Sequence, residues 1–213
     1  MDASKMTNNT TVESTRNRNR VNVRYLTVTA MLSAVAFVLM ALDFSLPMFI
    51  PPFIKLDLSE LPALIAAFSL GPVYGVAVCL IKNLLHLFIT TTGGVGELSN
   101  FLLGAVFVLI AGLVYKYKKN RKGALIGSLL GAAGMAVISV FSNYFFVYPV
   151  YYNFMPKEMI LAAYQQLNPS VENILQCLIY FNMPFTFVKG MLSVLITFLI
   201  YKRISPILKG PAR

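Results

Sequence analysis

Long apolar segments follow one another along most of this chain, and each is bounded by proline, glycine or clustered charge. A helix needs roughly 20 predominantly apolar residues to cross the hydrocarbon core of a bilayer, and several segments meet that requirement. Hydrophobic residues make up 57% of the 213-residue sequence and charged residues only 12%, which is unlike an ordinary water-soluble domain. The sequence therefore predicts an all-α integral membrane protein that folds as one helical bundle.

Apolar runs and the breaks between them divide the bundle into six helices. We predict these helices at residues 24–43, 59–70, 72–90, 97–116, 123–148 and 172–202. The second is too short to cross a bilayer at 1.5 Å per residue, and Gly71-Pro72 ends it sharply. Residues 24–213 then form a single transmembrane domain, and the polar residues 1–23 form a basic, disordered tail.

Clustered basic residues predict the orientation of the bundle. The clusters precede the first helix, occupy residues 116–122 and follow the last helix. Basic clusters usually face the cytoplasm, and an even number of crossings places both termini on that side. Basic clusters that face the cytoplasm and attract anionic lipid explain the net charge of +10, so nucleic acid is not a predicted partner. The connections at 44–58, 91–96 and 149–171 are external.

The first external connection contains the stretch SLPMFIPPFIKLDLSELP, which is rich in proline and in apolar residues. Proline restricts the backbone, so this composition suits a semi-rigid segment better than a flexible linker. Two interpretations are open. The connection is either a flap over an outward-facing cavity or a loop that rests among the lipid headgroups.

A polar stripe interrupts the last predicted helix. Asn182, Thr186 and Lys189 are spaced i, i+4 and i+7, so they share one face. An ionisable group at membrane depth costs about 2.5–3.5 kcal/mol on insertion scales, and such groups usually face a cavity or a partner. Pro184 lies among them and should kink the helix, because it removes one backbone hydrogen bond. We predict that the stripe faces the interior, where it lines a binding cavity or only holds helices together.

Two other predicted helices carry polar residues toward the same external end. Ser139 and Asn143 are four residues apart, and the aromatic-rich run NYFFVYPVYY begins at the second of them. Glu97 and Asn100 share a face where the fourth helix begins. Aromatic density near a membrane boundary is also typical of an interfacial belt. Amide groups and aromatic faces that converge suit a flat organic solute with polar edges better than a bare ion.

Metal and disulfide chemistry have little support in the sequence. His86 is the only histidine, so no second one completes a usual zinc site, and we interpret it as a hydrogen-bonded structural group. Cys79 and Cys177 stand alone in apolar segments and are interpreted as packing residues. No metal and no cofactor are predicted.

Motifs for catalysis and for ATP hydrolysis are missing from the sequence. There is no GxxxxGK[ST] phosphate loop, no nucleophile elbow and no HExxH. Glu60 and Glu97 are the only acidic candidates for a proton relay, and both are predicted near the membrane surface. These absences disfavour an integral membrane enzyme. Uphill movement of a solute would then take its energy from an ion gradient or from another subunit.

Small residues recur at every fourth position in two of the predicted helices. They are Ala30 and Ala34 in the first helix and Gly123, Gly127 and Gly131 in the fifth. Such spacing lets another helix approach closely. It mostly reflects packing within one chain, so by itself it is weak support for a partner protein.

Four stretches of the chain together resemble a known family of membrane proteins. In sequence order they are KLDLSELPALIAAFSLGPVYGVAVCLIKNLLHL, GGVGELSNFLLG, NYFFVYPVYY and FNMPFTFVKG. The chain resembles, from about residue 24 to its end, the substrate-binding S components of energy-coupling factor (ECF) transporters. Within that family the resemblance is to the riboflavin-specific branch.

The resemblance implies a six-helix fold in a bacterial plasma membrane that captures riboflavin from outside, with FMN as a further candidate ligand. It also implies assembly with a transmembrane T component and two ATPase subunits, and release of the vitamin after the S component topples in the membrane. The family's AxxxA contact with the T component falls on Ala30 and Ala34.

Roles for individual site residues also follow from the resemblance. The family's flavin-binding asparagine falls on Asn143, and its lysine falls on Lys189, whose ammonium would bind the carbonyl edge of the flavin ring. Where the family pattern leads us to expect a second asparagine, this chain has Thr186. Asn182, one turn earlier on the same face, is the candidate substitute.

We therefore expect a riboflavin-binding transport subunit without catalysis of its own. Its predicted substrate-binding residues are Asn143, Lys189, Asn182, Thr186, Glu97 and Asn100. An ion-coupled secondary transporter of another small aromatic solute or vitamin is the alternative, and uptake without any ATPase subunit would favour it. A purely structural membrane subunit would tolerate the loss of both Asn143 and Lys189 with no change except in stability.

Overall fold

The computed structural model describes residues 23–209, with side chains described up to Tyr201. The predicted tail lies outside the described residues except for its last residue, Val23. The basic side chains that close the sequence, from Lys202 onward, also lie outside this description.

The described chain is almost wholly helical, because each apolar run forms a helix. In sequence order the elements are α2 (Val23–Ala41), β1 (Phe44–Ser45), β2 (Lys55–Leu56), α3 (Glu60–Ser69), α4 (Pro72–His86), η1 (Leu87–Ile89), α5 (Val95–Tyr117), α6 (Arg121–Ser142), η2 (Asn143–Val147), α7 (Tyr148–Tyr151), α8 (Lys157–Gln165), α9 (Ile174–Cys177), η3 (Leu178–Asn182) and α10 (Met183–Lys209). η1 is a 3-10 helix, whereas η2 and η3 are π-helical turns. β1 and β2 pair antiparallel within residues 42–59, which we call the hairpin loop.

Five helical segments of the described chain are long and apolar enough to cross a membrane. They are Val23–Ala41, Pro72–Ile89, Val95–Tyr117, Arg121–Tyr151 and Ile174–Tyr201. A helix occupies each of the six predicted ranges, but α3 has only ten residues and is too short to span. The prediction was incomplete in the external connections, because 149–171 contains α8 and 44–58 contains the β1–β2 pair.

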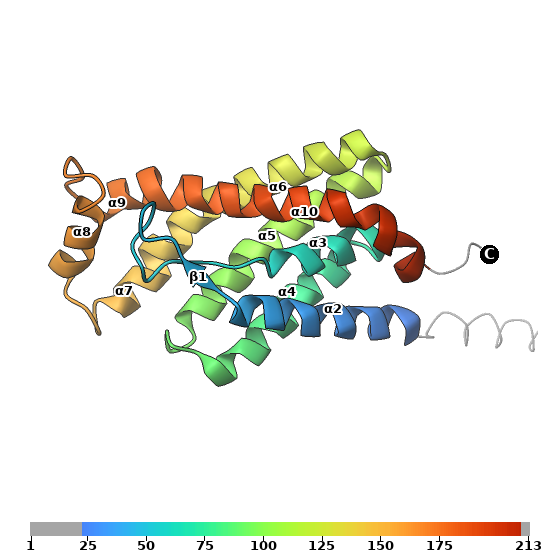
Figure 1. Ribbon diagram of the computed structural model, residues 1–213, viewed down its shortest axis with the longest axis horizontal. Helices are drawn as coiled ribbons and strands as arrows, with labels where there is room; N and C mark the ends of the chain where they lie inside the picture. Colours follow the sequence, from blue (N-terminus) through green and yellow to red (C-terminus); the bar gives the residue numbers. More distant parts are fainter. Residues whose placement is uncertain (1–22, 210–213) are drawn as a thin grey trace, which may run out of the picture.

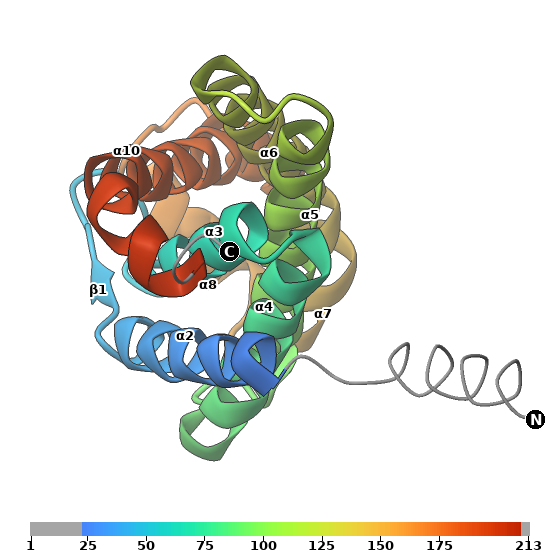
Figure 2. The ribbon, with the colours of Figure 1, turned by 90° about the vertical axis from the view of Figure 1, so that its right-hand side faces the viewer.

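Helix α3 lies at the centre of the bundle, surrounded by α2, α4, α5 and α10 (Figure 2). Every residue from Glu60 to Phe68 is buried. A helix that is buried on all sides needs neighbours on all sides, and the four longer helices supply them. Gly71 ends α3 with a φ of 121°, a conformation that glycine adopts easily, and Pro72 begins α4.

The small residues of α6 and of α2 lie in different surroundings. A Cβ atom on Gly131 would stand 2.6 Å from the carbonyl oxygen of Phe107 on α5, and Gly127 makes a similar approach. The glycine spacing of α6 therefore serves packing within the chain, as such spacing mostly does. Ala30 and Ala34 on α2 are both exposed, so their face is covered by no part of the described chain.

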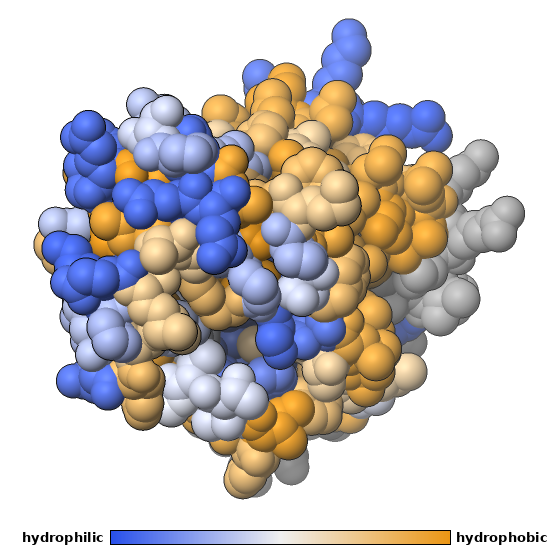
Figure 3. Space-filling model, turned by 60° about the vertical axis from the view of Figure 1, so that its left-hand side comes forward, coloured by the Kyte–Doolittle hydropathy of each residue, from blue (hydrophilic) through white to orange (hydrophobic). Residues whose placement is uncertain are grey.

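The two ends of the bundle differ in character (Figure 1). Val23, the α3–α4 turn and the basic turn at 116–122 lie at one end, which we call the basic end. The hairpin loop, the loop before α5 and helices α7 to α9 lie at the opposite end, which we call the hairpin end. Figure 3 shows polar side chains gathered over the hairpin end, beside a largely hydrophobic flank. This layout fits a membrane protein with two wetted ends and lipid around its middle.

Candidate functional site

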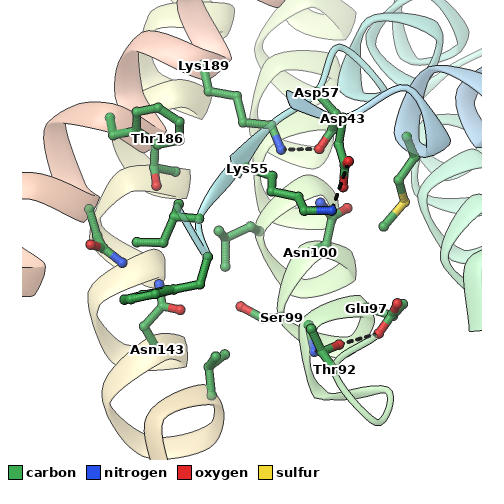
Figure 4. A pocket seen from close by; sticks show the side chains of 18 of the residues that line it. Asp43, Lys55, Asp57, Thr92, Glu97, Ser99, Asn100, Asn143, Thr186 and Lys189 are labelled. Atoms are coloured by element: carbon green, nitrogen blue, oxygen red, sulfur yellow. Dashed lines mark hydrogen bonds and ion pairs between the residues drawn. The ribbon is translucent and has the colours of Figure 1, made fainter. Parts of the chain in front are cut away.

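A cavity of about 220 Å³ opens at the hairpin end of the bundle. Its walls come from the hairpin loop, the loop before α5, the first turns of α5, the η2–α7 segment and the η3–α10 segment. Figure 4 shows Asn143, Thr186 and Lys189 on the helical walls of this cavity, with Lys55 and Asp57 reaching it from the hairpin loop. The six residues predicted for substrate binding all line this one cavity.

The polar stripe of the last membrane helix faces the cavity, as its spacing predicts. Asn182, Thr186 and Lys189 are all buried, and all three line the cavity wall. Just before Pro184 the helix changes to π-helical geometry, with the N–H of Met183 bonded to a carbonyl five residues earlier. Proline cannot donate a backbone hydrogen bond, and the π-helical turn adapts the helix to that loss.

A second π-helical turn, Asn143–Val147, occupies the corresponding place on the neighbouring wall. Pro149 follows it by two residues, just as Pro184 follows the turn Leu178–Asn182 by two residues. Such turns widen a helix locally and redirect its side chains, and they are frequent at functional sites. Both cavity-lining asparagines on these walls, Asn143 and Asn182, therefore lie in π-helical turns.

An ion pair links the hairpin loop to α10 at the cavity wall. The ammonium group of Lys189 donates to Oδ2 of Asp57 at 2.8 Å. Oδ1 of Asp57 accepts from the backbone N–H of Ser59 at 2.9 Å and from the hydroxyl of the same serine. Burial alone raises the pKa of the Asp57 carboxyl, but the ammonium groups of Lys189 and Lys82 outweigh burial and hold that pKa below its ordinary value. Asp57 is therefore a carboxylate at neutral pH.

A second buried ion pair lies directly behind the first. Lys82 on α4 donates to Oε1 of Glu60 on α3 at 3.0 Å and to the hydroxyl oxygen of Ser59. The side chains of Lys82 and Glu60 are both 0% exposed, and neither residue lines the cavity. Glu60, expected near the membrane surface, is instead enclosed within the protein because α3 lies at the centre of the bundle. Two carboxylates and two ammonium groups thus balance in charge, which buried ions require.

A chain of hydroxyl groups orients Asn182. The hydroxyl of Tyr164 donates to Oδ1 of Asn182 at 2.6 Å, and the hydroxyl of Tyr148 lies 2.5 Å from that of Tyr164. Burial raises the pKa of Tyr164 well above its ordinary value, so this hydroxyl stays protonated and donates. Since the oxygen of Asn182 is occupied, its N–H groups are what it can offer to a ligand. Tyr164 comes from α8, the helix that sequence reasoning did not find.

Asn143 and Asn100 present complementary groups to the cavity. Nδ2 of Asn143 donates to the backbone carbonyl of Ser139 at 2.8 Å, which leaves its oxygen as an acceptor. Oδ1 of Asn100 accepts from Nδ2 of Asn83 at 3.3 Å, which leaves its N–H groups as donors. The cavity therefore offers both donors and acceptors from amide groups of fixed orientation.

Both carboxylate oxygens of Glu97 are engaged within the protein. Oε1 lies 2.8 Å from Nδ1 of His86, whereas Oε2 accepts from the hydroxyls of Thr90 at 3.0 Å and Thr92 at 2.9 Å. Glu97 is only 4% exposed although it lines the cavity. Its contacts join the end of α4 to the loop before α5, and they give His86 a hydrogen-bond partner within the protein.

Side-chain contacts hold the hairpin loop over the cavity. The ring of Phe53 meets those of Tyr151 and Tyr164 edge to face, with centroids 6.3 and 6.1 Å apart. Lys55 and Asp43 form an ion pair of 3.0 Å across the β1–β2 ladder, and both line the cavity. The loop is therefore packed on the bundle and forms one wall of the site.

Sequence reasoning missed Asp57, which it assigned only to an external connection. The signal lies in KLDLSELP, where an acid and a serine directly precede the short second helix and a second acid begins it. Lys82 also went without a role, although a lysine within an apolar helix requires an acidic partner. Partners that are distant in sequence supply these contacts, so spacing along one helix does not reveal them.

The arrangement suits binding better than chemistry. It offers oriented amides, the ammonium group of Lys189 and aromatic walls, which together fit a flat solute with hydrogen-bonding edges. Within residues 23–209 no three histidine, cysteine, aspartate or glutamate side chains converge as metal ligands would. Cys79 and Cys177 are both buried and unlinked, as packing residues are.

Comparison with known proteins adds an independent finding. The family model described as "ECF transporter, substrate-specific component" matches residues 24–201. The riboflavin transporter RibU of Staphylococcus aureus (strain TCH60) is 36% identical over 188 residues, which cover 88% of this chain and 93% of that protein. The riboflavin transporter FmnP of Bacillus subtilis (strain 168) is 32% identical over 189 residues, covering 87% of this chain and 94% of that one. A solved structure described as "Structure and mechanism of the S component of a bacterial ECF transporter" superposes with a TM-score of 0.70 at 34% identity, covering 89% of this chain and 100% of that chain.

Proposed function

Because this chain belongs to the substrate-specific components of ECF transporters, we propose that its hairpin-end cavity binds riboflavin for import. The family gives the protein the task of capturing a substrate for transport, which is not catalysis. Two relatives that are more than 30% identical over most of both chains carry the name of riboflavin transporters. The substrate proposed here follows from those relatives together with the groups that line the cavity.

One observation carries the proposal: amide groups from three walls and the ammonium group of Lys189 face the same aromatic-lined cavity. The isoalloxazine ring of riboflavin is flat, with carbonyl oxygens and an imide N–H along one edge. The oxygen of Asn143 can accept from that N–H, while Asn100 and Asn182 can donate to ring or ribityl oxygens. Tyr148 and Tyr151 line the wall beside them and provide aromatic surface.

We place the carbonyl edge of the ring at Lys189. A charge-assisted hydrogen bond from a buried ammonium group is about twice as strong as a neutral one. Thr186 stands one turn away on the same face, where its hydroxyl can donate or accept. Glu97 contributes by shaping the cavity, since its own oxygens are bonded to His86 of α4 and to the loop before α5.

The hairpin loop acts as a flap in this proposal. The cavity of about 220 Å³ is smaller than the roughly 300–1,000 Å³ of typical ligand pockets, so a tricyclic vitamin with a polyol chain needs one wall to move. Among the walls, the hairpin loop is held by side-chain contacts and a two-residue ladder, whereas the helical walls belong to long helices and the loop before α5 is bonded to Glu97. The loop is therefore the wall that moves at the lowest cost.

The hairpin end faces the outside of a bacterial plasma membrane, and the basic end with both termini faces the cytoplasm. Six membrane-embedded helices, with α3 as the short central one, then form the transmembrane domain. Since the sequence has no phosphate loop, ATP is hydrolysed by two partner ATPases, which a transmembrane T component connects to this subunit.

A riboflavin titration tests the proposal directly. The detergent-solubilised protein is expected to quench the vitamin's own fluorescence saturably, at about one vitamin per protein, and the absence of tryptophan removes one source of interference. FMN titrated in parallel shows whether a phosphate is tolerated. A well-folded sample that leaves riboflavin fluorescence unchanged would sink the proposal, and uptake by vesicles without any ATPase would favour an ion-coupled carrier.

The exposed alanines of α2 are the proposed contact with the T component. Replacing Ala34 by tryptophan is expected to lower riboflavin uptake by cells at least about tenfold, because a bulky side chain prevents close approach of another helix. Affinity of the isolated protein should stay within about twofold of the wild type. Val35→Trp is the matched control, since Val35 is exposed on a different side of the same helix. Equal uptake by both variants would remove the assignment of Ala30 and Ala34.

A further inference from the structure

Lys189 forms ion pairs with two carboxylates but is hydrogen-bonded to only one of them. Its ammonium group donates to Asp57 at 2.8 Å and lies 3.5 Å from Oε2 of Glu60. That oxygen of Glu60 is buried and has no hydrogen-bond partner. Oε1 of the same carboxylate is bonded to Lys82. The ammonium group of Lys189 is thus shared between two acids, and its shorter contact is the one with Asp57.

The two acids differ in where they would hold the lysine. Asp57 lines the cavity, whereas Glu60 lies behind the wall and is fully enclosed. An unsatisfied carboxylate oxygen in a low-dielectric interior attracts any donor within reach. Without a competing cation, Glu60 would therefore draw the ammonium of Lys189 back from the cavity.

Lys82 supplies that competing cation. It neutralises Glu60 through a 3.0 Å bond, and it donates to the hydroxyl oxygen of Ser59, which in turn donates to Asp57. Lys82 therefore offsets the charge of Glu60 behind the wall. Through Ser59 it also holds Asp57 in the wall. Its own side chain is 0% exposed and does not line the cavity, so it acts only through these neighbours.

We propose that Lys82 is a positioning residue for ligand binding: it neutralises the charge of Glu60, so that Lys189 is hydrogen-bonded to Asp57 and keeps its ammonium group at the cavity. The inference rests on the proposed function, since it takes this cavity to be the riboflavin site and Lys189 to contact the vitamin. It assigns a role to a buried charge that touches no ligand.

Two single charge removals, Lys82→Met and Glu60→Gln, make a matched pair. Each leaves one unbalanced charge in the cluster, so both are expected to lower the melting temperature. Riboflavin affinity should distinguish the two variants. It should be at least about tenfold weaker than the wild type in Lys82→Met, but within about threefold of the wild type in Glu60→Gln. The double variant, which has no acid to attract Lys189 away, should return to within about threefold of the wild type. Equal affinity losses in the two single variants would mean that the cluster is only structural and would overturn the proposal.

A second measurement reports the accessibility of the Lys189 ammonium group without using riboflavin. Reductive methylation of Lys189 in the ligand-free protein, followed by mass spectrometry, should be several-fold slower in Lys82→Met and no slower in Glu60→Gln. Equal rates in the wild type and Lys82→Met would overturn the inference. If the wild type fails to bind riboflavin, only the proposed function is wrong. The methylation rates of Lys189 in the wild type and the two variants still test whether Lys82 positions Lys189. Where Lys82→Met does not fold, Lys82→Gln retains a donor for Ser59 without the charge and should show the same slowing.

Discussion

Replacing Lys189 by methionine is expected to weaken riboflavin binding by roughly 30- to 5,000-fold. Methionine keeps a similar length and an apolar stem, but it removes the ammonium group at the cavity wall. Truncating one partner of a buried charge pair costs about 2–5 kcal/mol, and Asp57 loses its partner at 2.8 Å as well. Fluorescence titration measures the affinity, and thermal unfolding in detergent measures the accompanying loss of stability.

The double variant Asp57→Asn, Lys189→Met separates binding from folding. It restores the charge balance of the cluster, so its melting temperature should rise above that of Lys189→Met. Its affinity should stay low, because the group that faces the carbonyl edge of the ring is still missing. If the affinity recovers with the stability, Lys189 acts only through the fold and the proposed contact with riboflavin is wrong.

Replacing Gly131 by alanine is expected to destabilise the bundle by about 1–3 kcal/mol, the usual cost of overpacking. The added Cβ would stand 2.6 Å from the backbone oxygen of Phe107 and 3.0 Å from its ring. A backbone carbonyl within α5 cannot turn aside, so α5 and α6 must separate along their contact. The melting temperature of the ligand-free protein in detergent measures the effect.

Gly134→Ala is the matched control on the same helix. There the added Cβ would meet the end of the Ile110 side chain at 2.7 Å, and a flexible side chain can move away. Both substitutions gain about 1 kcal/mol of helix propensity, so only the neighbouring atoms differ. Gly134→Ala should be neutral or slightly stabilising. Equal melting temperatures for the two variants would show that the α5–α6 contact is looser than the structure indicates.

The membrane helices are predictable from the sequence because lipid requires long apolar runs. The first and fourth predicted helices, 24–43 and 97–116, differ by at most two residues at either end from α2 and α5. Helix α8 escaped prediction because its nine residues, KEMILAAYQ, lie outside the apolar runs and are much less apolar than the membrane helices. Its place depends on tertiary contacts, chiefly those of Ile160 and Tyr164 with the core at the hairpin end.

The helical part of the candidate site is predictable for a similar reason. Asn182, Thr186 and Lys189 follow helical spacing, and a lysine in an apolar run indicates a cavity or a partner. For Asp57 the acids of KLDLSELP are visible in the sequence, but nothing in that segment shows that the proline-rich loop folds back onto α10. Glu60 escaped for a related reason: a short helix at the membrane boundary and a short helix at the centre of the bundle have the same sequence pattern.

The shortness of α3 has a consequence for the distance that the cargo must travel. Its ten residues reach about 15 Å from the cavity wall toward the basic end, against a hydrocarbon core of about 30 Å. In the proposed site, a vitamin held against Asp57 and Lys189 would lie about half a hydrocarbon thickness from the basic end before any ATP is spent. Between that site and the basic end, the buried helix α3 fills the centre of the bundle. Release of the vitamin at the basic end would therefore need the whole subunit to move, because in the described part of the chain α3 lies where a channel would run.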